Sequence, residues 1–596
     1  MEFVVLSIRQ LVTESLRNLY NHKYRYLLTS ILLQVFLMTV GRFVLSSVFR
    51  LALRLAGVSS LTQENTFEVI GQTGPFLMLI VYSLLVASFI FLEYICLVYM
   101  IVSSYRNVEI RDMLKATWQK IKWLSGPQLF VFLSYLALMI PVGNLGLSSP
   151  LLERFRIPDF ITGELLKTDL GIVIYYSVIG LVVYLNIRLI YFLPLSVVND
   201  NTPWENVTQS WRLTRQNKFR LIVVIGLFTG LVAGAGILMT YLLSIIFGYL
   251  DNLWNNIALQ TLFYSLVKGT IYIVAFLNKL VTIEVLVNHL LGADEADQSI
   301  AYVTLSESKA LPFRYPKWSK LVLLVTVVVS VIYNGVQLYL VNLNKEVLMI
   351  AHRGDTTAGV ENSLEALEAA SLKGADLVEM DVLMTADKQF VVIHDNNLRR
   401  LAGRNWNVSE KNLVDIEGLQ IFQNDFTSEI VTLETYVKRA QELNQPLLIE
   451  LKPHGDEPDN YVDLVLAELK RLNIKKTDKV MSLDLKVMEK LEQKAPELST
   501  GYVIPLQFGN FGNYSVDFYV IEDFSYNEII MLSAEQQGKD LYVWTINDAT
   551  SLSNYLQSPV NGIITDELAL FKMEQASLLE DDSYFARALR LLGIRE

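Results

Sequence analysis

The sequence predicts a multi-pass α-helical membrane domain followed by an α/β TIM (β/α)8 barrel with a β-hairpin insertion. Three observations lead to this prediction. Long apolar runs fill residues 26–344, short β-rich runs alternate with helical patterns after residue 345, and two of those runs lie only about five residues apart. Alternating strands and helices are typical of a parallel sheet, and about 225 residues of such units suit an eight-stranded barrel.

The composition excludes some classes of function. The chain has 596 residues, 52% of them hydrophobic, and a formal net charge of −11. This negative charge, and the lack of a basic stripe with interleaved aromatics in the second half, argue against a nucleic-acid partner. The single cysteine, Cys96, can form neither an intramolecular disulfide nor a cysteine metal site.

The first half contains seven runs that are long and apolar enough to span a bilayer, which takes about 20 residues. The predicted spans are 27–49, 74–105, 124–146, 170–198, 221–248, 257–291 and 321–343. The N-terminus and alternate loops carry 17 Lys and Arg residues, and the opposite loops carry five. The excess of positive charge predicts a cytoplasmic N-terminus, and an odd number of crossings then predicts an extracellular barrel.

We expect four parts along this cell-membrane protein. They are a transmembrane domain with about six spans over residues 1–320, a seventh transmembrane helix and linker over 321–344, the barrel over 345–570, and an amphipathic tail over 571–596. Gly226, Gly230 and Gly234 share one helix face, which permits close helix contact within the bundle or between the protomers of a homodimer.

Ionisable residues also occur inside the apolar runs, where each is costly in hydrocarbon. They are Arg42, Glu93, Arg188, Lys268, Lys279 and Glu284. Two interpretations stay open: a cavity for a phosphate-bearing or lipid-like molecule, and ion pairs or snorkelling near span ends. In either case the domain is expected to contact membrane lipids.

The second half contains nine β-rich runs, one more than a barrel needs. They are 347–351, 377–382, 390–394, 447–451, 480–482, 499–503, 517–521, 541–545 and 562–565. The turn at residues 385–389 between the second run and the third is too short for a parallel crossover, so this pair must be a hairpin. Its turn brings His394 opposite Met380, beside Glu379 and Asp381, at the mouth of the barrel where such enzymes act.

The residues at strand ends predict a metal-assisted catalytic site. His352 and His394 each end a run, and they are expected to form a functional pair. Glu379, Asp381 and Glu450 lie within apolar strands, where an unpaired charge is costly, so a hard divalent cation or basic side chains must neutralise them.

Two basic residues adjoin these positions. Arg353 and Lys452 can bind phosphate oxygens. A cation that stabilises charge on a phosphate, with one histidine accepting a proton and the other donating one, suits phosphoester chemistry.

Seven motifs now resemble, in order, those of the glycerophosphodiester phosphodiesterases. They are AHRG (351–354), VENS (360–363), GADLVEMDV (374–382), TADKQFVVIHD (385–395), IELK (449–452), VWTIN (543–547) and NGIITD (561–566). The apolar half looks like the membrane domain that precedes this barrel in some Gram-positive bacterial members. The resemblance implies hydrolysis of a glycerophosphodiester, derived from lipid or from envelope glycerol-phosphate polymers, to glycerol 3-phosphate and an alcohol.

The resemblance also implies roles for individual residues. The catalytic pair corresponds to His352 and His394, and the ligands of one Ca²⁺ or Mg²⁺ ion to Glu379, Asp381 and Glu450. Phosphate contacts correspond to Arg353 and Lys452, supporting residues to Glu361 and Asn362, and an aromatic of the glycerol pocket to Trp544, for which core packing is an equal alternative. Departures from the family pattern, such as Val360 in place of the usual proline, fall in turns and flanks.

Two other functions stay open at this stage. One is a related lipid phosphodiesterase, either a lysophospholipase D or a phospholipase C-like enzyme. The other is a non-catalytic membrane transporter or sensor whose barrel binds a ligand. The second is disfavoured because every chemical group of the predicted site is present.

Overall fold

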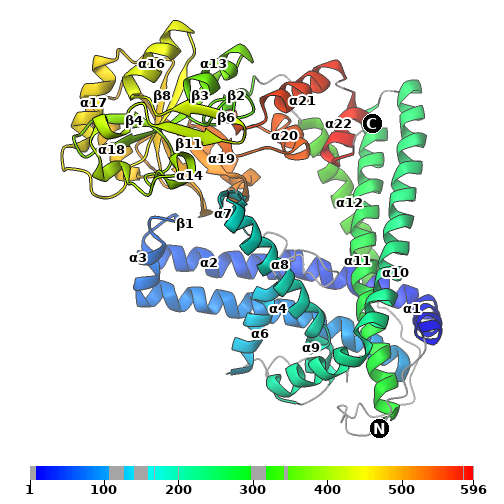
Figure 1. Cartoon of the computed structure of the whole chain (residues 1–596). Coiled ribbons are helices and arrows are strands. Elements are labelled where there is room, and N and C mark those ends of the chain that lie inside the picture. Colours follow the sequence, from blue (N-terminus) through cyan, green and yellow to red (C-terminus); the bar gives the residue numbers. More distant parts are fainter. Residues whose placement is uncertain are drawn as a thin grey trace. The chain divides into compact units, whose positions relative to one another are not determined.

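The computed structural model in Figure 1 describes residues 8–106, 127–139, 157, 159–166, 168–198, 201–254, 256–296, 317–340, 346–581 and 583–594. Its contacts divide the chain into two compact units. The first unit comprises Met1–Ala52, Thr73–Ile157 and Leu165–Tyr339, and the second comprises Leu53–Gln72, Pro158–Glu164 and Leu340–Glu596. The second unit therefore contains a segment from between two helices of the first.

The first unit is helical. Helix α1 (Ile8–Phe36) continues through a π-helical turn (Leu37–Gly41) into α2 (Arg42–Ala56). The other helices are α4 (Thr73–Arg106), α6 (Pro127–Met139), α8 (Asp169–Arg188), α9 (Phe192–Val198), α10 (Pro203–Leu253), α11 (Ile257–Ala296) and α12 (Lys317–Leu340). Helix α7 (Asp159–Leu166) crosses the boundary between the units.

Six helical stretches of the described residues are long and apolar enough to cross a membrane. They are Arg9–Ala56, Thr73–Val102, Asp169–Val198, Phe219–Leu253, Ile257–Leu290 and Trp318–Tyr339. Each contains or overlaps one predicted span. The remaining predicted span, 124–146, lies partly outside the described residues, and its described part forms α6.

The start of helix α10 is fixed by a cap. Thr202 and Glu205 form a capping box in front of the helix, and Pro203 occupies its first turn. The expected close contact at Gly226, Gly230 and Gly234 is absent within the described chain, because an added Cβ would meet nothing within 4 Å. Gly236 makes that contact instead, since its Cβ would lie on the Val274 side chain of α11. The homodimer stays a prediction.

The second unit is built around a closed barrel of eight parallel strands. They are β2 (Leu348–Ala351), β3 (Leu377–Met384), β7 (Leu447–Leu451), β8 (Lys479–Ser482), β9 (Ser499–Ile504), β11 (Phe518–Glu522), β12 (Asp540–Trp544) and β13 (Gly562–Thr565). The sheet order is β2-β13-β12-β11-β9-β8-β7-β3-β4, and pairing of β2 with β3 closes it. The predicted membrane domain followed by a TIM barrel is therefore confirmed.

Helices alternate with these strands and lie around them (Figure 1). They are α13 (Leu364–Leu372), α16 (Leu433–Glu442), α17 (Tyr461–Arg471), α18 (Leu485–Lys494), α19 (Glu528–Gln536), α20 (Ala549–Leu556) and α21 (Leu568–Glu580). Side-chain caps begin many of them, for example Ser363 before α13 and Asp484 before α18. The last helix, α22 (Tyr584–Leu591), contacts α20.

The predicted hairpin is also present. Strand β4 (Phe390–Val392) pairs antiparallel with β3, with Val382 opposite Val392, a register that places His394 opposite Met380 as expected. The insertion that follows contains the short helices α14 (Arg399–Ala402) and α15 (Leu413–Ile416) and a second hairpin, β5 (Gln420–Gln423) with β6 (Phe426–Glu429). This second hairpin was not predicted.

A third strand pair joins distant parts of the chain. Strand β1 (Ser60–Thr62) lies between α2 and α4 in the sequence and is followed by α3 (Thr66–Gly71). It pairs antiparallel with β10 (Gln507–Gly509), in the loop between β9 and β11. This pairing was not predicted either.

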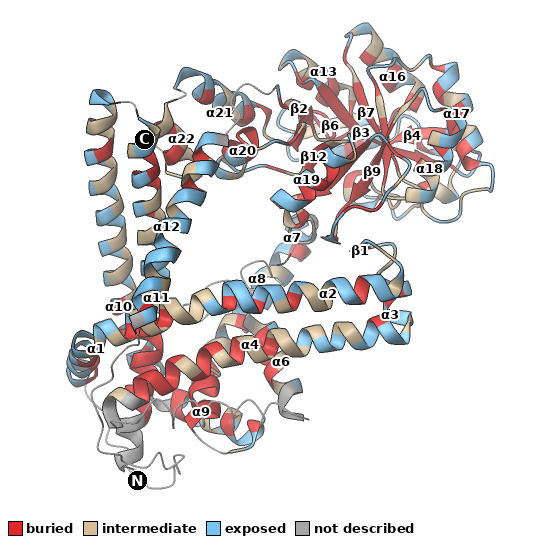
Figure 2. Cartoon of the chain, turned by 180° about the vertical axis from the view of Figure 1, so that it is seen from behind, coloured by how far each residue is buried: buried red, intermediate tan, exposed pale blue. Residues whose placement is uncertain are grey.

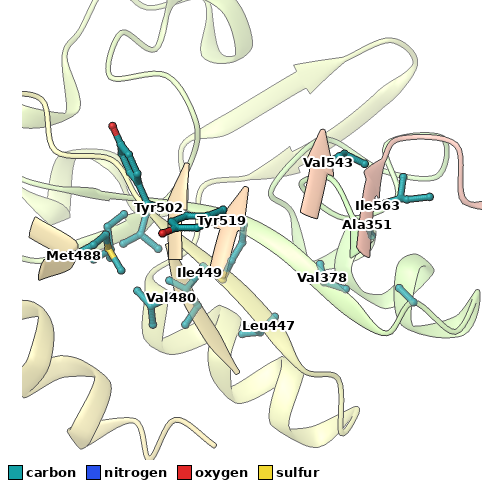
Figure 3. Close-up of a cluster of buried hydrophobic side chains, with 14 of the residues drawn as sticks. Ala351, Val378, Leu447, Ile449, Val480, Met488, Tyr502, Tyr519, Val543 and Ile563 are labelled. Atoms are coloured by element: carbon teal, nitrogen blue, oxygen red, sulfur yellow. The ribbon is translucent and has the colours of Figure 1, made fainter. Parts of the chain in front are cut away.

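The barrel core follows the two-residue period of its strands. In β3, Val378, Met380 and Val382 pack outward against the helices, so Glu379 and Asp381 point to the barrel interior. Figure 3 shows this outer layer, with Val378, Ile449 and Val480 from the strands and Met488 from α18. Figure 2 shows the strands as buried. Inward positions therefore carry chemistry only where polar residues interrupt the apolar series.

Candidate active site

Neighbouring strands bring the predicted carboxylates together. Asp381 of β3 is paired in register with Glu450 of β7, and Glu379 lies two residues before Asp381 on the same face. All three side chains are buried, and one oxygen of each lies within 4.8 Å of the others. Within the described chain, Glu379 Oε1 accepts no hydrogen bond, and Asp381 Oδ1 and Glu450 Oε1 have only the Lys452 ammonium near them, without a well-aligned hydrogen bond. Buried oxygens with so few donors fit the coordination of a hard divalent cation.

Burial and neighbouring charges shift the pKa values of two of these carboxylates. Burial raises the pKa of Glu379 well above its usual value, and the neighbouring charges of Asp381 and Glu450 raise it further. Burial also disfavours the charged form of Asp381, but Lys452, then His394 and Arg353, outweigh it and hold its pKa below the usual range. Full ionisation of all three buried carboxylates is therefore unfavourable unless a cation neutralises part of their charge.

Two basic side chains reach into the same cluster. Lys452 Nζ lies 3.2 Å from Asp381 Oδ1 and 3.1 Å from Glu450 Oε1. Burial opposes its charge, but these two carboxylates raise the pKa of Lys452. Arg353 Nε lies 3.3 Å from Asp381 Oδ2, and the Arg353 backbone N–H donates to Glu379 Oε2 at 2.8 Å. Both basic groups remain charged and can bind an anion such as a phosphate.

A carboxylate orients each predicted catalytic histidine. His352 Nδ1 lies 2.8 Å from Asp566 Oδ1, and His394 Nδ1 lies 2.7 Å from Asp395 Oδ1. Because an ionised carboxylate only accepts, each Nδ1 carries the proton and each Nε2 is left for a substrate. Burial opposes ionisation of the two aspartates, yet hydrogen bonds and nearby positive charge lower the pKa of each to about 2. Burial lowers the pKa of His394.

A further set of residues holds these groups in place. Glu361 accepts from Arg353 Nη1 at 2.9 Å and from Arg400 Nη2 at 2.6 Å, and Arg400 Nε donates to Asp395 Oδ2. Asn362 donates to Asp381 Oδ2 at 2.7 Å and accepts from the Asp381 backbone N–H at 3.0 Å. Glu361 and Asn362 thus support the site from behind, without lining its cavity.

The groups line one cavity of ≈ 200 Å³. Its lining residues are His352, Arg353, Glu379, His394, Glu450, Lys452, Met481, Leu483, Val503, Pro505, Val520, Trp544 and Ile564. The polar residues come from β3, β7 and the loops after β2, β4 and β7, and the apolar ones from β8, β9, β11, β12, β13 and the loops after β8 and β9. The cavity therefore has a charged wall and an apolar wall that includes Trp544.

Sequence reasoning missed four residues of this site. They are Asp395, Arg400, Asn547 and Asp566. Asp395, Asn547 and Asp566 stand in the HD, TIN and TD portions of the recognised motifs, so a polar residue next to a strand end was the available signal. His454 also follows a strand, but it interacts with Glu457 and does not line the cavity.

Two family models match this chain. Residues 12–334, more than half of the chain, match the family described as the membrane domain of glycerophosphoryl diester phosphodiesterase. Residues 352–570 match the glycerophosphoryl diester phosphodiesterase family.

Curated relatives and a solved structure match the barrel part. The Bacillus subtilis protein YhdW, whose name assigns it to the glycerophosphodiester phosphodiesterases, is 28% identical over 37% of this chain and 93% of its own length. A glycerophosphodiester phosphodiesterase of Caldanaerobacter subterraneus is 26% identical over 37% and 94%. The solved structure of a glycerophosphodiester phosphodiesterase from Parabacteroides distasonis is 24% identical over 39% and 99%, with a TM-score of 0.36. On the family matches, this chain belongs to the glycerophosphodiester phosphodiesterases that carry an N-terminal membrane domain.

Proposed function

We propose that this membrane protein hydrolyses glycerophosphodiesters to glycerol 3-phosphate and an alcohol by histidine acid–base catalysis. One observation carries the proposal: a single cavity is lined by two histidines, two basic side chains and two carboxylates, Glu379 and Glu450, which converge with the buried Asp381. Each histidine has its Nδ1 fixed by a carboxylate. Proton donors and acceptors beside an anion-binding pocket are what phosphodiester hydrolysis requires.

Glu379, Asp381 and Glu450 would hold the divalent cation, Ca²⁺ or Mg²⁺. Both ions prefer oxygen ligands, and in the described chain none of these three oxygens accepts a well-aligned hydrogen bond, although the Lys452 ammonium lies beside two of them. When bound, the cation would supply charge stabilisation for the phosphate. Arg353 and Lys452 bind and orient the phosphate oxygens beside it, which fixes the phosphorus relative to both histidines.

The two histidines divide the proton transfers. Nε2 of one accepts the proton of the attacking water as its oxygen bonds to phosphorus. Nε2 of the other donates a proton to the alcohol oxygen as its P–O bond breaks. Asp566 and Asp395 keep each ring in the tautomer that permits this, because they accept from Nδ1–H. One water is consumed and the proton count balances over the cycle.

The test uses the full-length protein in lipid with glycerophosphocholine and Ca²⁺ or Mg²⁺. We expect release of glycerol 3-phosphate, loss of the rate with EDTA, and a fall of about 10²–10⁴-fold in His394→Ala. His454→Ala is the matched control, since His454 lies in the same barrel outside the cavity, and it should keep the wild-type rate. Equal rates in the three proteins, or a rate insensitive to EDTA, would refute the proposal.

We also propose that the barrel is extracellular and the N-terminus cytoplasmic. The support is the asymmetry of 17 against five basic residues in alternate loops. A single cysteine introduced at Glu535, in a chain carrying Cys96→Ser, should react with a membrane-impermeant maleimide in intact cells. Labelling only after lysis would reverse the orientation.

A lysophospholipase D activity is the second candidate. The apolar wall of the cavity favours it, because an acyl chain could lie there. A human protein named lysophospholipase D GDPD3 is 27% identical over 26% of this chain and 51% of its own length. Product analysis separates the candidates, through glycerol 3-phosphate against lysophosphatidate, and a cyclic phosphate would instead indicate phospholipase C-like chemistry.

A further inference from the structure

A segment from between two candidate membrane spans is part of the catalytic unit. Residues 57–72, here called the strap, follow the stretch Arg9–Ala56 and precede Thr73–Val102, both apolar enough to span a membrane. The strap nevertheless belongs to the same compact unit as the barrel. A segment bounded so closely by two spans has too few residues to extend far from a membrane surface, since each residue spans at most about 3.6 Å.

The strap is attached by backbone and side-chain contacts. Ser60 pairs with Gly509 and Thr62 with Gln507, and all of Ser60, Thr62 and Gln507 are buried. Glu64 Oε1 accepts from the backbone N–H of Leu485 at 2.9 Å, at the first turn of α18. These contacts are specific, because they satisfy backbone groups that would otherwise need water.

The attachment lies beside the apolar wall of the cavity. Strand β10 begins two residues after Pro505, which lines the cavity, as does Val503 of β9. Ser525 ties the two together, because its Oγ accepts from the Gln507 N–H at 2.9 Å and its hydroxyl donates to the Pro505 carbonyl at 3.4 Å. The strap therefore holds the loop after β9 on the catalytic face of the barrel.

The strap also presents apolar side chains to solvent. On α3, Phe67 is 85% exposed and Ile70 is 43% exposed, while Val69 between them is buried. Positions three apart lie on one helix face, so Phe67 and Ile70 form a single apolar patch. Two large exposed apolar side chains on a segment flanked by spans are suited to the interfacial region of a bilayer.

We infer that the strap docks this patch into the lipid surface and thereby gives the apolar wall of the cavity access to substrates held in the bilayer. This rests on the proposed function and favours its second candidate, the lysophospholipase D activity. The preferred substrates are glycerophosphodiesters that carry an acyl chain, whose glycerophosphate part binds at the charged wall and whose chain passes along the apolar wall. Water is added across the same P–O bond, to release the head-group alcohol and an acylated glycerol 3-phosphate.

The experiment uses the full-length protein in vesicles, with lysophosphatidylcholine in the bilayer as one substrate and glycerophosphocholine in solution as the other. In Phe67→Ser/Ile70→Ser, kcat/KM for the lipid should fall about tenfold, because two apolar side chains no longer enter the interface. The rate on glycerophosphocholine should stay the same. Leu532→Ser, an exposed apolar position on α19, is the control and should change neither rate.

A second variant tests the attachment itself. Gly509 has φ +97°, and a Cβ there would lie 2.8 Å from the Ser59 carbonyl oxygen, so Gly509→Ala should displace the strap and lower the lipid rate more than the soluble one. Gly538→Ala is the matched control, since Gly538 also has a left-handed φ of +68° but faces open space. It should leave the ratio of the two rates unchanged.

The outcomes separate the two proposals. A wild-type protein that hydrolyses neither substrate would overturn the proposed function. A wild-type protein that hydrolyses glycerophosphocholine but not the lipid would overturn only the inference about the strap. So would strap variants that lower both rates equally or leave both unchanged.

Discussion

At the mouth of the barrel, three buried carboxylates share two basic side chains, whereas in the helical unit the carboxylate of Glu93 meets the ammonium of Lys279 at 2.5 Å. Gln34 donates to the same Glu93 oxygen, and Lys279 also lies over the Tyr94 ring. Both sites bury charge at a cost. They differ in balance, since the barrel has negative charge in excess and the helical pair does not.

The difference teaches how to separate a binding site from a structural ion pair. Glu93 also has one oxygen without a hydrogen bond, but a single oxygen does not chelate a cation. In the described residues, one group of three or more converging ligands is found, and it is the barrel group. We therefore expect substitutions at the barrel group to change activity, and substitutions at the helical pair to change stability.

The largest expected effect is at Glu379. Glu379→Gln removes a metal ligand, so the phosphodiesterase rate should fall by about a thousandfold or more, which corresponds to the several kcal/mol that a cation supplies. Without added metal, the melting temperature should stay the same or rise, because a buried charge beside two others is removed. Activity assays and thermal unfolding with and without Ca²⁺ measure both effects.

Exposed Glu535 provides the control, and Glu535→Gln should keep both the rate and the stabilisation by Ca²⁺. A Glu379→Gln protein that still melts higher with Ca²⁺ would show that the cation binds elsewhere. If Glu379→Gln unfolds the protein, the barrel site contributes to stability as the helical pair does, and the expected difference between the two sites is wrong.

Substitution in the helical ion pair should lower stability and leave activity unchanged. Lys279→Met leaves the Glu93 carboxylate buried without its ammonium, and this should lower the free energy of unfolding by about 3–5 kcal/mol. The rate per folded molecule on glycerophosphocholine should be unaffected. Unfolding of the purified protein in detergent, with activity normalised to the folded fraction, tests this expectation.

The double variant Glu93→Gln/Lys279→Met should recover most of that stability, because no unpaired charge is left. If the double variant instead keeps full stability but loses phosphodiesterase activity, the helical pair has a functional role and the contrast between the two sites fails.

A smaller effect on activity than at Glu379 is expected at the aspartates that orient the histidines. Asp566→Asn should lower kcat by about 10–100-fold with little change in KM, because His352 loses its orientation while the phosphate-binding groups are untouched. Asp395→Asn should act similarly on His394. Steady-state kinetics measure the effect, and exposed Asp463 gives the control Asp463→Asn. A rise in KM alone would mean that Asp566 contributes to substrate binding and does not position the histidine.

Much of this architecture could be predicted from local sequence patterns. All nine β-rich runs became strands, since their bounds depend on runs of neighbouring residues, and the hairpin turn placed His394 opposite Met380 because a short connection leaves one geometry. The predicted site residues lie together at one mouth of the barrel because of the strand arrangement. The parallel strands of a barrel end on a common face.

Two of the parts that were missed depend on contacts distant in sequence. Asp566 meets His352 across 214 positions, and no local period indicates that partner. Strand β1 has three residues, too few for an alternating pattern, and its contact from Ser60 to Tyr514 spans 454 positions. The glycines of α10 did not indicate the contact within the bundle, because spacing defines a helix face and only the neighbouring helix decides which face is used.

The smallest expected effect is at an exposed ion pair, which contrasts with the two buried sites. Glu434 accepts from Arg471 at 2.8 Å, and this contact and Lys438 lower the pKa of Glu434 to about 2. A lowered pKa stabilises the fold above the unfolded value of about 4.3, and that contribution is lost as the pH falls through about 2. Both side chains are at least one-third exposed, so water and salt screen the pair.

Glu434→Gln should therefore shift the melting temperature by no more than about 1 °C at pH 7 and physiological salt. Any shift should shrink as salt is raised, because a pair in solvent is screened over about 8 Å. A shift as large as that of Lys279→Met would mean that exposure does not decide the value of an ion pair in this chain. The contrast between the barrel site and the helical pair would then have to be explained by local geometry, since burial would no longer distinguish them.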